Sequence, residues 1–237
     1  SYVFEDHVDD DGQSEAPILI RVQLDVHGDG LTVDFTGSSP QVAGPVNCTP
    51  NMTASAVYCA ALMAIGNDIP ANAGCYRPIA IAAPPGLAVS AVEPAPVANL
   101  MAVGHRVVTT VLGAFSRAIP QRIPAAYYGV SYAYAVGLTS PEGERHVYFD
   151  LECGGWGAHP EADGAHALSC GFHNVANSPI EMIEQTYPVE FHAYALRENS
   201  GGNGRTRGGN GLIRDFEVRV PGTLAANLDR FRFPPYG

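Results

Sequence analysis

Apolar and polar side chains alternate with a period of two in several parts of this chain, and this alternation is the strongest constraint on its fold. Every second residue from Ile18 to Val26 is apolar, and after the turn sequence HGDG the alternation resumes over residues 31–35. Successive side chains of a strand point to opposite faces, so this pattern predicts a β-hairpin with one buried face. The same period in residues 147–151 and 216–220 predicts further strands.

Two longer segments have the spacing of helices. Residues 52–65 are apolar nearly all round, which predicts a helix buried on most sides, and Thr49 with Pro50 marks its start. Residues 100–115 carry apolar side chains at helical spacing behind Asn99, which predicts an amphipathic helix capped by that residue. The residues off its main apolar stripe are Arg106, Thr109, Thr110 and Arg117.

A third, shorter helix is predicted from Ser178 to about Gln185. The sequence SPIE supplies a cap hydroxyl, a proline at the first helical position and Glu181 to close a capping box. Strands before, between and after the three helices favour an α+β fold rich in antiparallel sheet. No long-period repeat or charged linker divides the chain, so residues 1–237 are treated as one partial domain without an internal boundary.

Charge and composition exclude several classes of protein. The chain has 24 acidic and 13 basic residues, a net charge of −11, which repels the phosphates of a nucleic acid. No apolar run is long enough for a bilayer, and the acidic first residues are unlike a signal peptide, so a soluble, cytoplasmic protein is expected. Five cysteines without a CxxC pair predict reduced thiols, and Cys59, in an apolar stretch, is expected in the core.

The segment SGGNGRTRGGNG, residues 200–211, is the most unusual part of the sequence. Glycines allow successive backbone amides to converge on an anion, and the guanidinium groups of Arg205 and Arg207 can grip a phosphate or carboxylate bidentately. The anion-binding candidates here are Arg205, Arg207, Gly201, Gly202 and Gly204. The alternative is a solvated connection between strands over residues 189–196 and 212–220.

A second glycine-rich segment, GGWGAHPEADG over residues 154–164, follows a predicted strand and holds the only tryptophan. Its backbone can make close approaches that side chains would block, as a substrate-facing turn requires. The substrate-binding candidates are Gly154, Gly155, Trp156 and Asp163.

No metal site or catalytic group is predicted. The neighbouring acidic and histidine residues match no metal-ligand spacing, so none is assigned as a ligand; they are His159, Glu161, Asp163, His166 and His173. Glu181 and Glu184 are interpreted as structural residues of the short helix rather than as an acid/base pair. The order of Ser, His and Asp residues defines no nucleophilic triad, so the catalytic residues are unknown.

Several motifs occur together in the order found in one known family. They are DFTGSSPQVAGPVN (residues 34–47), NAGCYRPI (72–79), PPG (84–86), GGWGA with its DG (154–164), NVANSPIE (174–181), SGGNGRTRGG (200–209) and DRFRFPPYG (229–237). The chain therefore resembles the hydantoinase B/oxoprolinase family over nearly its whole length. It differs in having AHALSCGFH where many relatives have another His-containing segment, and Asn199 where DSGG is usual, which indicates a divergent substrate.

The resemblance implies an ATP-dependent enzyme that opens lactam, hydantoin or oxoproline rings. An A-type subunit would bind ATP with Mg²⁺ and phosphorylate the substrate, while the B-type subunit helps complete the reaction. Ketone carboxylases of the acetone and acetophenone type are the alternative activity, and a non-catalytic scaffold fragment is a third possibility.

The expected partners are an A-type subunit, the remaining B-type polypeptide and a small-molecule substrate. Relatives carry an HxxD element and a later His pair, resembling metal ligands, in a preceding half that this sequence lacks. The chain is therefore expected to be inactive alone, with any divalent metal on that other half.

Overall fold

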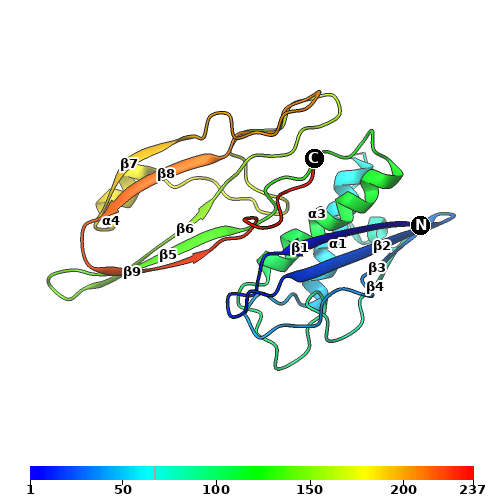
Figure 1. The fold of residues 1–237 in the computed structure, drawn as a ribbon, viewed down its shortest axis with the longest axis horizontal. Helices are drawn as coiled ribbons and strands as arrows, with labels where there is room; N and C mark the ends of the chain where they lie inside the picture. Colours follow the sequence, from blue (N-terminus) through cyan, green and yellow to red (C-terminus); the bar gives the residue numbers. More distant parts are fainter. Residues whose placement is uncertain (67) are drawn as a thin grey trace.

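The computed structural model describes residues 1–66 and 68–237, which form two groups of secondary-structure elements placed side by side (Figure 1). The first group contains β1 (Tyr2–Val8), β2 (Ile18–His27), β3 (Gly30–Asp34), β4 (Ile79–Ala82), α1 (Pro50–Ile65), α2 (Ala73–Tyr76) and α3 (Met101–Ala118). The second contains β5 (Tyr132–Thr139), β6 (Arg145–Glu152), β7 (Val189–Leu196), β8 (Leu212–Val218), β9 (Gly222–Asn227) and α4 (Ile180–Thr186). The predicted α+β class is confirmed.

The first group is a four-stranded sheet in the order β1-β2-β3-β4, with α3 packed against β1 and β2, and α1 against α3. The predicted hairpin is β2 and β3, and its inward side chains, including Ile20, Val22 and Val33, are fully buried. Val26, at the end of the alternation, is 60% exposed instead. Pairing is antiparallel except between β3 and β4, which run parallel.

Helix α1 begins as the sequence predicts. The hydroxyl of Thr49 accepts a hydrogen bond from the amide of Met52 at 3.3 Å, and Pro50 occupies the first turn, where its missing N–H is not needed. The helix ends at Gly66, whose φ of +96° suits glycine and whose amide donates to the carbonyl of Leu62.

Helix α3 corrects two details of the prediction. Asn99 does not cap it, because its side-chain oxygen accepts a hydrogen bond from the Asn227 amide, and the cap position falls on Leu100. The polar side is not solvated either: Arg106 and two threonines beside it are fully buried, since the sheet, α1 and the C-terminal segment surround the helix. Arg117, near its end, is exposed as expected.

The second group packs the sheet β6-β5-β9 against the β7-β8 pair and α4, around a separate cluster of apolar side chains. In β6 the sequence pattern predicts that Val147 and Phe149 face the core, but the structure shows the opposite. Tyr148 is 2% exposed, whereas Val147 and Phe149 are 62% and 58% exposed. Tyr148 turns inward because it packs against rings from β5, β7 and β8.

The short helix α4 begins at Ile180, after the predicted Ser178, and makes no side-chain cap hydrogen bond, so the expected capping box is wrong. The carboxylate of Glu184 accepts a hydrogen bond from the amide of Phe191 at 2.7 Å, which joins α4 to β7. Among the described residues, no helix is long and apolar enough to cross a membrane.

Candidate functional site

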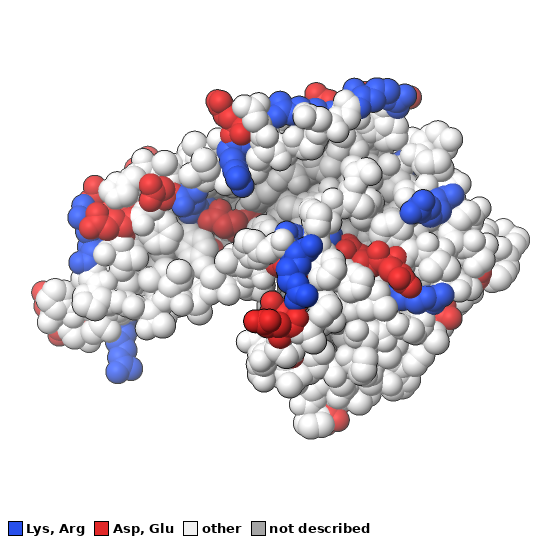
Figure 2. All heavy atoms as spheres, in the orientation of Figure 1, with Lys and Arg blue, Asp and Glu red and all other residues white. Residues whose placement is uncertain are grey.

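A cavity of about 1080 Å³ lies where the two glycine-rich segments meet the C-terminal segment. Residues 125–128, 152–160, 197–214 and 224–237 contribute most of its wall. Figure 2 shows the molecular surface hollowed below its upper edge, where the glycine-rich loops lie in Figure 1. A cavity of this size accommodates a small organic molecule.

The charged residues around the cavity are mostly cationic. Arg197, Arg205, Arg214 and Arg230 line it, and Glu152 is the one acidic residue among the described lining residues. Four of the chain's 13 basic residues but only one of its 24 acidic residues are therefore found here. In a chain with a net charge of −11, basic side chains are therefore concentrated around this cavity.

Three of these arginines already have partners. The Nε of Arg214 lies 3.0 Å from Glu152, and its Nη1 lies 2.5 Å from Asp150. Arg230 makes a two-point contact with the Asp6 carboxylate at 2.9 and 3.0 Å. Arg205 donates to the carbonyl of Pro160 at 2.5 Å and keeps other donors.

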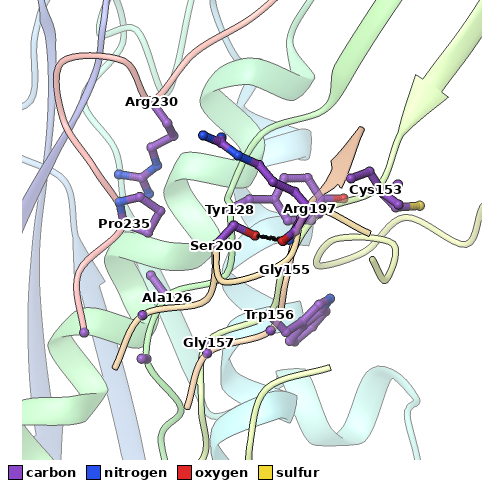
Figure 3. Close-up of a pocket in the computed structure, with 18 of the residues that line it drawn as sticks. Ala126, Tyr128, Cys153, Gly155, Trp156, Gly157, Arg197, Ser200, Arg230 and Pro235 are labelled. Carbon is purple, nitrogen blue, oxygen red and sulfur yellow. Dashed lines mark hydrogen bonds between the residues drawn. The ribbon is translucent and has the colours of Figure 1, made fainter. Parts of the chain in front are cut away.

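Arg197 differs from the other three, because its guanidinium makes no hydrogen bond or ion pair with the described part of the chain, residues 1–66 and 68–237. It is exposed, at the end of β7, where its backbone carbonyl accepts a hydrogen bond from the Ser200 hydroxyl at 2.7 Å. Figure 3 shows its side chain extending over the cavity on the side where Arg230 lies. Arg197 therefore offers a whole guanidinium fork to a ligand.

Aromatic rings form an apolar wall below these cations. Trp156 stacks on Tyr127 with ring centroids 4.9 Å apart, and its indole N–H donates to the carbonyl of Ser169 at 2.9 Å. Tyr128 stacks on Tyr132 at 5.8 Å. These contacts fix the orientation of the rings, so the cavity presents a rigid apolar surface beside a cationic one (Figure 3).

The glycines of the two segments are required by direct contact between backbones. A Cβ on Gly155 would lie 2.0 Å from the carbonyl oxygen of Gly209, and a Cβ on Gly209 would lie 1.9 Å from that of Ala165. The amide of Gly209 also donates to the carbonyl of Trp156 at 2.8 Å. Close backbone approach, which the sequence predicted for the 154–164 segment only, is therefore the reason for glycine at both positions.

Side-chain contacts join the same two segments. The Asp163 carboxylate accepts a hydrogen bond from the Arg207 amide at 2.7 Å, and the Thr206 hydroxyl donates to the His159 carbonyl at 2.6 Å. The Gly164 amide donates to the Arg207 carbonyl. The 200–211 segment is thus a structured wall of the cavity rather than a loose connection between strands.

The structure distributes the candidate residues unevenly around this cavity. Those that line it are Arg205, Gly202, Gly204, Gly154, Gly155 and Trp156; those that do not are Arg207, Gly201 and Asp163. Asp163 holds the backbone, and the Arg207 guanidinium is directed to Asn199 at 3.5 Å.

Sequence reasoning missed Arg197, Arg214 and Arg230. A usable signal for Arg197 was its place in the sequence, three residues before the glycine-rich segment begins at Ser200. Arg214 and Arg230 reach the cavity from β8 and from the chain end, and only the tertiary fold brings them there.

A separate cluster joins three side chains that the sequence does not group. His105 of α3, Cys170 and His173 place one donor atom each within 4.8 Å of one another. Burial lowers the pKa of His105 to about 3, with a smaller contribution from His173, and burial raises the pKa of Cys170 to about 12. Without a cation, the cluster therefore consists of neutral imidazoles and a thiol at neutral pH.

These observations define an α+β protein with a large, rigid cavity that combines an aromatic wall with arginines. The family described as Hydantoinase B/oxoprolinase matches residues 1–237, and the chain belongs to this family. The predicted resemblance is confirmed.

Individual relatives agree with this assignment. The chain is 34% identical to 5-oxoprolinase 1 of Arabidopsis thaliana over 236 residues, which cover 98% of this chain and 17% of that protein. The crystal structure of an ATP-dependent caprolactamase from Pseudomonas jessenii superposes with a TM-score of 0.79 at 28% identity, covering 91% of this chain and 39% of that one. A nucleotide-free acetone carboxylase shares the fold, with a TM-score of 0.83 at 17% identity over 96% of this chain and 34% of that one. The chain thus spans less than half the length of each.

Proposed function

We propose that this chain forms part of the B-type subunit of an ATP-dependent cyclic-amide hydrolase, which acts on a hydantoin, lactam or oxoproline ring. The family match over residues 1–237 is the observation that carries this proposal. Caprolactamase and 5-oxoprolinase, at 28% and 34% identity, support a cyclic amide as the substrate class.

The cavity is proposed to hold the ring or its phosphorylated form. A cyclic amide is a poor electrophile, and phosphorylation of its oxygen provides a leaving group and adds negative charge. The aromatic wall around Trp156 suits a flat ring, while Arg197 suits a phosphate or carboxylate, because its planar fork can make two parallel hydrogen bonds. Enclosure of such an intermediate also protects it from water.

Nucleotide chemistry is assigned to a partner. In this proposal ATP and Mg²⁺ bind to an A-type subunit, the remaining B-type polypeptide completes the assembly, and any divalent metal needed for catalysis is held outside this chain. The 237-residue chain alone is then inactive, and the assembly is cytoplasmic.

A ketone carboxylase is the second candidate, supported by the shared fold with acetone carboxylase. We favour the hydrolase because caprolactamase and 5-oxoprolinase 1 are 28% and 34% identical to this chain, whereas the carboxylase is 17% identical. A purely structural role for this part of the subunit is the third candidate.

The test uses the complete assembly with ATP and two sets of substrates: hydantoins, oxoproline and lactams, or ketones with bicarbonate. Ring-opened acids are the expected products, and carboxylated ketones would instead establish the second candidate. The chain by itself is expected to turn over neither set, and turnover by the isolated chain would contradict the assignment of nucleotide chemistry to a partner.

The role of the cavity is tested with Arg197→Ala, against Arg145→Ala as a matched control on the exposed surface of β6. Loss of a charge-assisted contact costs ~1.5–3 kcal/mol, so kcat/KM should fall roughly 10- to 150-fold for Arg197→Ala only. If both variants assemble and turn over like the parent, Arg197 does not bind substrate. If the Arg197→Ala assembly still opens cyclic amides at the parent rate, the proposed role of Arg197 is rejected, while the proposal that the assembly is a cyclic-amide hydrolase stands.

A further inference from the structure

We propose that His105, Cys170 and His173 form a three-ligand site for a thiophilic divalent cation, most suitably Zn²⁺. Residue spacing alone predicted no metal site, because His105 is 65 residues from Cys170 in the sequence. The fold removes that separation by packing α3 against the 168–173 loop. This proposal is independent of the substrate and partner assignments above.

The separations of the Cys170 sulfur from the two imidazoles agree with tetrahedral coordination. The Sγ of Cys170 lies 3.5 Å from Nε2 of His105 and 3.6 Å from Nδ1 of His173. With Zn–S and Zn–N bonds of about 2.3 and 2.05 Å and a tetrahedral angle, the sulfur and nitrogen ligands should be ~3.6 Å apart. The two sulfur–nitrogen separations are therefore those expected around a single zinc ion, and the third pair, the two imidazoles, lies within 4.8 Å.

One adjustment is needed for binding. Cys170 Sγ is almost equidistant from both nitrogens of His105, at 3.5 and 3.6 Å, so it does not lie along the lone pair of either nitrogen. Rotation of the Cys170 side chain toward one nitrogen of His105 would allow a single cation to contact both that nitrogen and the sulfur. In the present arrangement the sulfur lies 3.3 Å from the carbonyl of Val130, which accepts the thiol hydrogen and would be released on metal binding.

The chemistry of the donors selects the class of cation. Two imidazoles and one sulfur are borderline to soft ligands, which suit Zn²⁺ or Co²⁺ and disfavour Mg²⁺ and Ca²⁺, since those prefer oxygen. His105 is held for this role, because its ring stacks on Phe172 with centroids 4.4 Å apart and an interplanar angle of 6°. A fixed ring loses little conformational entropy when it binds a metal.

An unpartnered phenol beside the cluster provides a second, independent indication of a ligand. Tyr127 is 1% exposed, and its hydroxyl makes no hydrogen bond with any residue that the structure describes. A Cβ on Gly171 would lie 2.5 Å from that hydroxyl and 3.0 Å from Nδ1 of His105, so both atoms border the same point. A buried polar atom without a partner is uncommon, and a water or other fourth ligand on the metal would satisfy it.

The position of the site gives a cation a route from solvent and gives the bound cation a structural effect. His173 is only half-buried, which gives a route from solvent, whereas His105 and Cys170 are fully buried. The metal would connect α3 to the loop that contains Cys170 and His173. The carbonyl of Ser169 in this loop accepts a hydrogen bond from the Trp156 indole N–H, so the metal would also stabilise the cavity wall that Trp156 forms.

The test is metal binding by the full chain, purified with reduced thiols and stripped with a chelator. We expect one Zn²⁺ per chain in competition titrations, and Co²⁺ should give the near-ultraviolet absorption of a thiolate-to-cobalt charge transfer. Zn²⁺ should also raise the thermal unfolding midpoint, because a ligand that binds only the folded state stabilises it.

Cys170→Ser and His173→Gln are the test variants, with Cys153→Ser and His166→Gln as controls of the same residue types outside the cluster. Each test variant should weaken Zn²⁺ binding by about 100-fold or more, beyond the 10- to 100-fold typical of changes outside the ligands. Cys170→Ser should also remove the cobalt–thiolate band.

Near-ultraviolet circular dichroism identifies the variants that remain folded, and His173→Gln, at the half-buried position, is the less disruptive of the two. Substoichiometric metal after loading of the parent, or unchanged affinity in a folded His173→Gln or Cys170→Ser variant, would overturn the proposal.

Discussion

Replacement of Arg106 by methionine should strongly destabilise the fold. This side chain is fully buried in α3, where its guanidinium contacts Asp229 at 2.5 Å and Asp6 at 3.4 Å, and donates to the carbonyl of His7. Methionine fills a similar volume without the charge. Asp6 would keep Arg230 as a partner, but the buried carboxylate of Asp229 would lose its cation.

The expected cost is that of an uncompensated buried charge. Removal of one member of a buried ion pair typically costs about 3–5 kcal/mol, a large part of the roughly 5–15 kcal/mol that holds a domain together. Burial raises the pKa of the Asp229 carboxyl, and Arg106 opposes that effect, so the variant should bind a proton more readily at this position. For a chain of this size, the loss corresponds to a fall in Tm of roughly 6–20 °C.

Urea unfolding of the parent, Arg106→Met, Asp229→Asn and the double variant measures the effect as a cycle. Asparagine removes the charge at position 229 but can still accept the backbone hydrogen bonds made there, so the double variant should be less destabilised than the sum of the single variants, by roughly 0.5–3 kcal/mol. Arg117→Met, at the exposed end of the same helix, should cost within about 1 kcal/mol. A loss below about 1 kcal/mol for Arg106→Met, or strictly additive effects, would refute the reasoning.

Three further changes test other parts of the structure. Gly209→Ala should cost at least ~1–3 kcal/mol in thermal unfolding, because its Cβ would lie 1.9 Å from a carbonyl oxygen, whereas Gly202→Ala, with open space around it, should be nearly neutral. Asp11→Asn should lose roughly 1–2 kcal/mol at pH 7, because hydrogen bonds from three backbone amides outweigh burial and hold the Asp11 pKa below its usual value. The carboxylate stabilises the fold above pH ~4, so the difference from the parent in urea should shrink as the pH falls through that range; a constant difference would contradict this. Arg205→Lys should lower ATP-dependent turnover of the assembly roughly 10-fold if Arg205 contacts an anion, and parent-like turnover would leave it with only its contact to the loop.

The parts of the fold that the sequence predicted are those set by local patterns. The hairpin of β2 and β3 and the strand β8 follow from a period of two, and helix α1 follows from an apolar run and the cap chemistry of Thr49 and Pro50. Prediction was wrong where a distant partner replaced the local one. Asn99 contacts Asn227 rather than the helix end, and Tyr148 displaces its apolar neighbours from the inner face because other rings receive it.

The candidate site was predictable to the same extent. Glycine content identified both loops, because close backbone contact leaves a direct trace in the sequence. The cationic side chains were harder to choose: Arg205 and Arg207 were conspicuous among glycines, yet Arg197, which has the freer guanidinium, was not. Whether an arginine is free to bind a ligand depends on the hydrogen-bond and ion-pair partners that the fold places beside it. Those partners are distant in the sequence, so the residues next to the arginine do not reveal them.

The two ends of the described chain are in contact with each other beside the cavity. Asp6 and Asp9, near the start, bind Arg230 and the backbone amide of Phe231, more than 220 residues away. Because Arg230 also lines the cavity, its orientation there depends on a carboxylate contributed by β1 in the other group of elements. The first group therefore acts on the site through the C-terminal segment. A change at Asp6 should consequently alter both stability and ligand binding, whereas a change at Arg197 should alter binding alone.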